Sequence, residues 1–266
     1  MISKFRRQIA GAAVAIAAIG SVALVAYADH SWGNYHWART TSSFTLTLGD
    51  NVSSGWDSYL TQSSGDWSLS GVLDTVIAAG ATNPKNCRPV SGRAEVCNSK
   101  YGNNGWLGIA SIWVSGEHIT QGTVKFNDTY FNTSKYNTPA WKQFVACQEV
   151  GHIFGLDHQN EIFTDANLGT CMDYTSDPDG TLAGQLSNEH PNQHDYDELA
   201  LIYSHVDAAT TIGQGATLRG RAEVDHSDPG TWGKEIRRSS DGRGSLYLRD
   251  LGNGQKIFTF VIWAQE

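Results

Sequence analysis

Strands are predicted where apolar residues alternate with polar ones or follow each other closely. Residues 44–48 alternate between the two kinds, which is the pattern of a strand with one buried face. Residues 106–114 and 122–127 are rich in apolar and β-branched side chains, and we expect both to lie inside a sheet. Residues 72–79 are mostly apolar and predict either an interior strand or a buried helical turn, because periodicity does not decide between them.

A period of 3.6 residues predicts three helices, at residues 54–62, 140–154 and 191–205. The second has the clearest start, because Thr138 is a good N-cap and Pro139 occupies the first helical position. The third is amphipathic, with aromatic and aliphatic side chains on one side. Helices and strands are thus mixed along the chain, which favours an α+β fold.

Proline and glycine separate these elements from two less regular regions. Residues 80–105 contain Pro84, Pro89 and several glycines, so we expect a long loop there with at most a short hairpin. Beyond residue 207 the chain becomes rich in glycine and charge, and it ends in two apolar segments joined by a Gly-containing turn. These segments, 245–250 and 256–263, predict a terminal β-hairpin.

The first 28 residues have the pattern of a secretory signal peptide. Three basic residues precede a long apolar run, and Ala26-Tyr27-Ala28 matches a cleavage site. The apolar run is nearly long enough to cross a bilayer, so an uncleaved anchor is the alternative. We therefore expect three parts: a signal peptide at 1–28, a main domain at 29–206 and an extension at 207–266.

The expected mature chain is acidic, which limits its partners. The first 28 residues hold three of the 19 Lys and Arg residues and none of the 27 Asp and Glu residues, which leaves 16 basic against 27 acidic groups, or −11. Nucleic acids and anionic membrane surfaces both require basic patches, so neither is expected as a partner. The composition fits a secreted, extracellular protein, which we expect to be a monomer without membrane contact after cleavage.

The chemistry of the chain is concentrated between residues 148 and 158. On a helix, Gln148 and His152 are four residues apart and project from one face, with Glu149 beside them. Gly155 permits a sharp turn, which returns His158 toward the pair. Three neutral ligands and one carboxylate then surround a point, as in a catalytic zinc site with one position left for water.

This stretch resembles the metzincin signature H-E-x-x-H-x-x-G-x-x-H, with Gln148 in place of the first histidine. Metzincins carry a Met-turn downstream, and Cys171-Met172-Asp173-Tyr174 matches it 14 residues after His158. The chain is also similar to secreted bacterial proteins that carry the same Gln-Glu-Val-Gly-His sequence. The resemblance implies a mixed, twisted sheet with a zinc-site helix, a Met-turn and a C-terminal helix, followed here by a small β extension.

The resemblance also implies a reaction and a substrate. Zn²⁺ would be held by Gln148, His152 and His158, Glu149 would be the general base, and Met172 would form an apolar floor beneath the metal. Tyr174 would either stabilise the oxyanion or simply pack. The substrate would be a protein or peptide in extended conformation, paired with a cleft-edge strand at residues 109–114 or 118–124.

The four cysteines of an exported chain predict two disulfides, for which three pairings exist. A Cys87–Cys97 bond would close the loop at 80–105. The metzincin resemblance favours Cys147–Cys171 as the other, because it places the zinc helix beside the Met-turn. The alternative for this second pair is thiolate ligation of zinc.

Gln148 leaves the function open, because an amide oxygen is a weaker zinc ligand than imidazole. It could ligate and give a weaker site, another group such as His118, His190 or His194 could complete the shell, or the site could be impaired. Asp157 could ligate if His158 does not. Residues 177–180 form a turn whose carboxylates are a weakly supported Ca²⁺ site.

Two function classes remain from the sequence. The first is a secreted zinc metalloendopeptidase, and retention of Glu149 favours it, since a binding module has no need for a general base. The alternative is a catalytically impaired metzincin-like module that binds proteins or peptides outside the cell. Hydrolysis of a non-peptide amide is a third possibility that the sequence leaves open.

Overall fold

The computed structural model describes residues 30–182, 184–213 and 227–265. It has a mixed α+β fold, in which one twisted sheet is accompanied by a few helices. The expected signal peptide at 1–28 lies outside the described residues. Within those residues no helix is both long and apolar enough to cross a membrane.

The elements follow one another in a simple order. The first half contains β1 (His36–Trp37), β2 (Phe44–Asn51), α1 (Asp57–Trp67), β3 (Leu73–Ala79), β4 (Ala94–Ser99), β5 (Trp106–Ser115), β6 (His118–Asn127) and α2 (Asp128–Phe131). The second half contains α3 (Pro139–His152), α4 (Gln193–Ile202), a 3₁₀ turn (Pro229–Thr231), β7 (Lys234–Arg238), β8 (Gly244–Gly252) and β9 (Gln255–Trp263).

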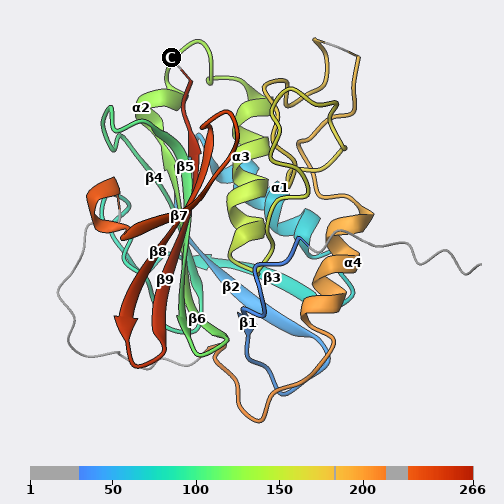
Figure 1. Ribbon diagram of the computed structural model, residues 1–266, viewed down its shortest axis with the longest axis vertical. Helices are drawn as coiled ribbons and strands as arrows, with labels where there is room; N and C mark the ends of the chain where they lie inside the picture. The colour runs from blue at the N-terminus through green and yellow to red at the C-terminus, as the bar shows by residue number, and fades with distance from the viewer. Residues whose placement is uncertain (1–29, 183, 214–226, 266) are drawn as a thin grey trace, which may run out of the picture.

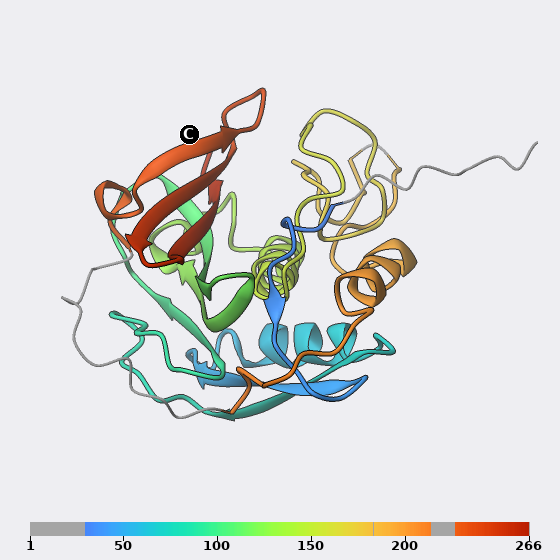
Figure 2. The same cartoon turned by 60° about the horizontal axis from the view of Figure 1, so that its bottom comes forward.

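The sheet runs in the order β3-β2-β4-β6-β5-β9-β8-β7, and β1 pairs with β6 outside this path. Strands β2, β3, β4 and β6 are parallel, whereas β5 is antiparallel to β6 and starts an antiparallel half. In Figure 1 the antiparallel strands stand at one side of α3, and α4 stands at the other. Figure 2 shows the sheet as an arc with α1, α3 and α4 on its inner side.

Helix α3 begins as the sequence predicts. The hydroxyl of Thr138 accepts a hydrogen bond from the Trp141 backbone N–H, and Pro139 follows directly at the first turn. The helix ends at His152, and Gly155 then turns the chain with φ of 98°, where a side chain would meet the Tyr35 carbonyl oxygen. The helix packs against α1, β5 and β6, so the residues of its last turn are enclosed.

Two sequence predictions in the first half are wrong in detail. Residues 94–99 are not loop but strand β4, which lies between β2 and β6. The sequence did not reveal this strand because it contains Glu95, and a carboxylate is rare inside a sheet. The buried Glu95 carboxylate pairs with Arg93 at 2.8 Å and accepts a hydrogen bond from Asn51 at 2.6 Å. Residues 73–79 form a strand, but β3 is an edge strand, and Val76 is accordingly exposed.

The predicted helices form with shifted boundaries. α1 starts three residues later than expected and continues to Trp67, while α4 is shorter than the predicted helix at 191–205. Asn192 caps α4, and its side chain accepts from the backbone N–H groups of His194 and Asp195. The Asp195 carboxylate in turn accepts from the Asn192 N–H, and this capping box fixes the start of the helix.

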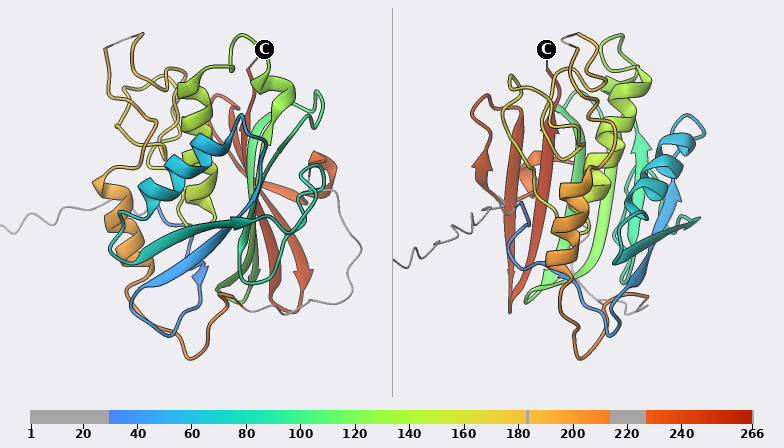
Figure 3. Two further views of the ribbon diagram at one scale, coloured as in Figure 1. Left: turned by 180° about the vertical axis from the view of Figure 1, so that it is seen from behind. Right: turned by 90° about the vertical axis from the view of Figure 1, so that its right-hand side faces the viewer.

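The predicted terminal hairpin is present as β8 and β9, with β7 added beside it. These strands continue the main sheet, because β9 pairs with β5 along nearly its whole length. Figure 3 shows β7–β9 and the pair β2–β3 on opposite sides of α3, at the two ends of the curved sheet. The division expected at residue 207 stays a prediction.

Both disulfides have the favoured pairing, Cys87–Cys97 and Cys147–Cys171. All four sulfurs are therefore taken, and thiolate ligation of zinc by Cys147 or Cys171 is excluded. The second bond joins α3 to the Met-turn next to Gln148. It holds two segments together that are 24 residues apart in the sequence.

Close packing of β5 on α3 gives the first testable prediction. A Cβ on Gly108 would lie 2.6 Å from Val145 and 2.9 Å from a carboxylate oxygen of Glu149. Gly108→Ala should therefore lower the free energy of unfolding by about 1–3 kcal/mol, as overpacking does. Gly65→Ala in α1 is the control, since nothing lies within 4 Å of its Cβ and alanine favours a helix. Equal denaturation midpoints for the two variants would contradict this packing.

Candidate metal centre

The last turn of α3 buries three polar side chains together. Gln148, Glu149 and His152 are each 1% exposed, although none of them is apolar. Position in the helix explains the arrangement, because the three side chains lie on the face that meets β5 and the Met-turn. Such groups are buried in proteins only when they have partners.

His152 and His158 face each other as the signature predicts. Their Nε2 atoms are 3.0 Å apart, and the rings meet edge to face. His152 Nδ1 donates to the Leu156 carbonyl oxygen at 2.9 Å, which leaves its Nε2 as a bare lone pair. Burial, and next to it His158, hold the pKa of His152 well below its usual range, so this imidazole is neutral.

Glu161 orients the second histidine. His158 Nδ1 lies 3.2 Å from Glu161 Oε1, so it donates there and also presents Nε2 to the site. Burial alone would raise the pKa of Glu161, but the hydrogen bond from His158 and the charges of His158 and Arg237 together outweigh it and lower this pKa. A carboxylate behind a ligating histidine fixes the tautomer and strengthens the ligand.

The amide of Gln148 has one defined orientation. Its Nε2 donates to the Cys171 carbonyl oxygen at 3.0 Å, so Oε1 is the atom on the other side of the amide. Oε1 is buried and has no hydrogen-bond partner among the described residues. An orphaned carbonyl oxygen four residues before His152 is available as a ligand.

Glu149 is the second buried group with an orphaned oxygen. Its Oε2 has no partner among the described residues, and the carboxylate lies against Gly108 of β5. Burial raises the pKa of Glu149 well above its usual range. A carboxyl group in this setting has a strong affinity for a proton, which is what a general base beside a metal-bound water requires.

The Met-turn lies beneath the helix. Met172 is fully buried, and a Cβ on Gly151 would lie 2.6 Å from its sulfur, so this glycine makes the close approach possible. Tyr174 packs on His158, with ring centroids 4.1 Å apart, and its hydroxyl points at Gly244 of β8. The observed contacts of Tyr174 are therefore packing contacts, and burial raises its pKa well above the usual range.

The C-terminal strands cover this centre. Phe260 of β9 stacks on the ring of His152, with centroids 4.2 Å apart and an angle of 9° between the planes. Strand β5 has β6 on one side and β9 on the other, and β6 lies between β4 and β5. Neither strand that was expected to receive a substrate therefore has a free edge in this conformation.

Arg237 of β7 ties the C-terminal strands, which cover the centre, to the loop that carries Asp157 and Glu161. Its guanidinium bonds both carboxylate oxygens of Asp157 and lies 3.1 Å from Glu161. It also lies over the ring of Trp32, 5.0 Å from the centroid. Asp157 is thus engaged by an arginine, which favours His158 as the ligand from this loop.

Sequence reasoning did not find Arg237, Phe260 or Glu161. The continuous apolar run in β9 was the one available signal, since it is typical of a strand with both faces covered. The other candidate ligands lie elsewhere: His118 contacts Asp207, His190 contacts Asp66 at 2.7 Å, and His194 stacks on His30. At residues 177–180 the carboxylates accept local N–H groups, which supports a surface turn and no Ca²⁺ site.

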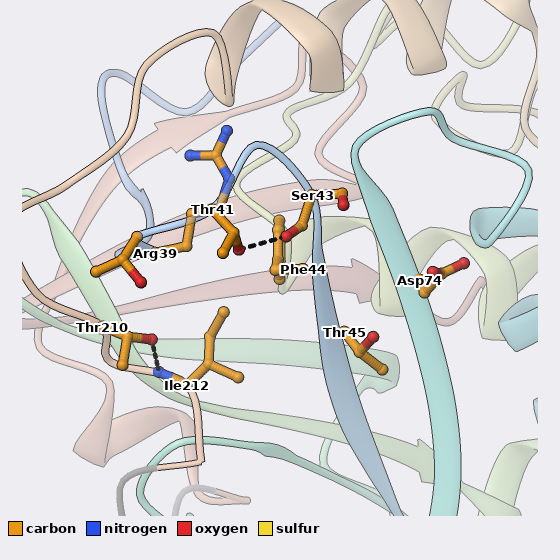
Figure 4. A pocket seen from close by; sticks show the side chains of 9 residues that line it. Arg39, Thr41, Ser43, Phe44, Thr45, Asp74, Thr210 and Ile212 are labelled. Atoms are coloured by element: carbon orange, nitrogen blue, oxygen red, sulfur yellow. Dashed lines mark hydrogen bonds between the residues drawn. The ribbon is translucent and has the colours of Figure 1, made fainter.

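One cavity of the fold lies away from this centre. Figure 4 shows it between β2, β3 and the segment around Thr210. Its volume is about 320 Å³. Its walls are mostly hydroxyl and aliphatic groups, and hydrogen bonds link Thr41 to Ser43 and Thr210 to Ile212. None of the predicted site residues lines it.

The residues present fit a zinc ion. Tetrahedral ligands at 2.0–2.1 Å from zinc lie about 3.4 Å apart, close to the 3.0 Å between the two Nε2 atoms. The set consists of two imidazoles whose Nδ1 atoms are hydrogen-bonded and one amide oxygen that has no partner among the described residues. A carboxyl group that does not ligate stands next to them.

No protein-family model and no curated protein matches the sequence. In three dimensions the chain is similar to high choriolytic enzyme 1, a hatching-enzyme zinc protease from the medaka fish Oryzias latipes. The TM-score is 0.35 at 10% sequence identity, over 64% of this chain and 94% of the other. A similarity of this degree decides neither the fold nor the activity.

Substitution of Arg237 and of its neighbour Arg238 tests whether Arg237 holds the C-terminal strands over the α3 centre. Arg237→Ala should lower the free energy of unfolding by about 1–3 kcal/mol, because it removes the guanidinium that binds both oxygens of the Asp157 carboxylate. Arg238→Ala should cost about 0–1 kcal/mol, since its pair with Glu235 is a surface pair. Hydrogen exchange of β7 amides should rise only in the first variant. Equal effects of both substitutions would show that Arg237 does not hold the cover.

Proposed function

We propose that this chain is a secreted zinc metalloendopeptidase whose catalytic centre is closed by its C-terminal strands. The observation that carries the proposal is the pair of facing Nε2 atoms of His152 and His158, each on a ring whose Nδ1 is hydrogen-bonded. Two bare nitrogens at 3.0 Å repel one another unless an ion or a proton lies between them. Zinc, coordinated also by Gln148 Oε1, is the ion that suits this mixture.

The metal and the protein divide the chemistry between them. Zinc, when bound, supplies a Lewis acid that polarises a water molecule and the scissile carbonyl group. Glu149 takes the proton of the attacking water and passes it to the leaving amine, and burial in the last turn of α3 fits it for both transfers. Glu161 keeps His158 in the tautomer that the metal needs.

The closed conformation adds a requirement to this proposal. An extended peptide that adds to the edge of β5 must replace β9, because both would use the same backbone groups. Phe260 must also leave His152 before a substrate carbonyl can approach. Hydrolysis therefore proceeds from a conformation in which β9 has moved away from β5.

The second candidate function is a silent binding module, and the same cover favours it. A glutamine at the first ligand position weakens zinc binding relative to histidine. In a domain that does not catalyse hydrolysis, Phe260 can cover His152 permanently. Zinc content and activity distinguish this module from the peptidase.

The purified mature protein should contain zinc at the α3 centre and should cleave an unfolded protein such as casein. Glu149→Gln should reduce hydrolysis by about 100-fold or more through loss of the general base, with zinc retained. Glu189→Gln is the control, because this glutamate accepts a hydrogen bond from Ser187, and neither residue belongs to the α3 centre. Elemental analysis and a fluorogenic casein assay provide the readouts. A protein without zinc or activity that gains both in Gln148→His would establish the silent module instead.

A disulfide staple tests whether β9 must move. Ser111 and Thr259 are opposite each other in β5 and β9, and their hydroxyl oxygens are 3.0 Å apart. Ser111→Cys combined with Thr259→Cys should form a bond and abolish hydrolysis, whereas each single variant should remain active. Thiol counting confirms the bond. Full activity of the stapled protein would show that peptides reach the centre with β9 in place.

A further inference from the structure

A second group of metal-ligating side chains gathers where the chain leaves α4 and passes β1. Imidazole nitrogens of His36 and His205 and a carboxylate oxygen of Asp207 all lie within 4.8 Å of one another. His118, at the start of β6, reaches the same aspartate oxygen at 3.2 Å. Three separate segments thus converge here: β1, the beginning of β6 and the chain that follows α4.

The distances within the cluster match a tetrahedral ion. His36 Nε2 lies 3.1 Å from His205 Nε2 and 3.3 Å from Asp207 Oδ1, and His205 Nε2 lies 3.7 Å from the same oxygen. Ligands of tetrahedral zinc are about 3.4 Å apart when the bonds are 2.0–2.1 Å long. These atoms therefore already surround a point at bonding distance from each of them.

The cluster is held in place by hydrogen bonds on its outer side. His36 Nδ1 donates to the Asn34 carbonyl oxygen at 2.6 Å, so Nε2 is the bare nitrogen. Asp207 Oδ2 accepts the Arg39 N–H at 2.9 Å, which leaves Oδ1 for the cluster. The buried guanidinium of Arg39 donates to the carbonyl oxygens of Tyr203 and His205 and so fixes the chain after α4.

Solvent exposure of part of the cluster also suits a metal ion. The side chains of His205 and His118 are 51% and 41% exposed, whereas those of His36 and Asp207 are 3% and 9% exposed. A cavity of about 430 Å³ borders the cluster, and His36 and His205 both line it. An ion can therefore enter from solvent, and the partly exposed His118 lies beside the cluster.

We propose that His36, His205 and Asp207 bind a second zinc ion, with His118 turning to supply the fourth ligand. Three imidazoles and one carboxylate favour Zn²⁺ over Ca²⁺ or Mg²⁺, which prefer oxygen ligands. The ion joins the N-terminal segment to the chain that follows α4. With four protein ligands this site is structural, and it is independent of hydrolysis at the α3 centre.

The number of zinc ions per chain tests this proposal without any reference to activity. Native mass spectrometry of the zinc-loaded mature protein should show two ions, and one in His205→Ala. Zinc should also raise the melting temperature of the wild-type protein more than that of this variant. His190→Ala is the control, since this histidine is equally exposed and lies beside Asp66, outside the cluster.

Further variants separate the two centres and guard against misfolding. Asp207→Asn keeps the bond from Arg39 and should lose the same ion as His205→Ala, while His118→Ala should weaken its binding. His152→Ala should lose the other ion and keep this one. An unchanged zinc count and zinc affinity in His205→Ala and Asp207→Asn would overturn the second site. A zinc count that falls only in His152→Ala leaves the proposed function standing without it.

Discussion

Burial of polar groups at the end of α3 is the constraint on which the rest of this structure depends. Within the described part of the chain, Gln148 and Glu149 each keep a buried oxygen without a partner, and a group of this kind costs about 1–3 kcal/mol of folding free energy. The last turn of a helix does not by itself offset this cost in folding free energy. The surrounding elements bind neighbouring atoms and not these two oxygens: the Met-turn carbonyl accepts from the Gln148 amide nitrogen, and Glu161 accepts from His158.

The C-terminal strands also reach this region. β9 completes the sheet beside β5, Phe260 covers His152, and Arg237 neutralises the acidic pair formed by Asp157 and Glu161. The cover both stabilises the fold and closes the centre. A catalytic role thus requires part of the main sheet to separate, and a binding role does not.

Both candidate metal centres orient a histidine by the same kind of hydrogen bond. In each, a histidine ties Nδ1 to a backbone carbonyl group and presents Nε2: His152 with Leu156, and His36 with Asn34. A fixed tautomer lowers the cost of ordering the ligand when an ion arrives. The centres differ in exposure, since the α3 centre is buried under β9 and the second is open to solvent through His205.

Local signals predicted much of this from the sequence. Thr138 and Pro139 determine where α3 begins, and the spacing from His152 to His158 places their Nε2 atoms face to face. Contacts between residues far apart in the chain could not be predicted from the sequence. β4 was missed because the partners of Glu95 include Asn51, 44 residues away, and the pairing of β9 with β5 joins segments about 150 residues apart. The cluster at His36 was missed because its ligands are dispersed along the chain.

The most direct test of the central claim is a crystal structure of the zinc-loaded protein with anomalous scattering recorded at the zinc edge. The account predicts an anomalous peak within bonding distance of His152 Nε2, His158 Nε2 and Gln148 Oε1. Zinc-loaded crystals without a peak between these histidines, and with a water molecule or a proton shared there instead, would contradict it.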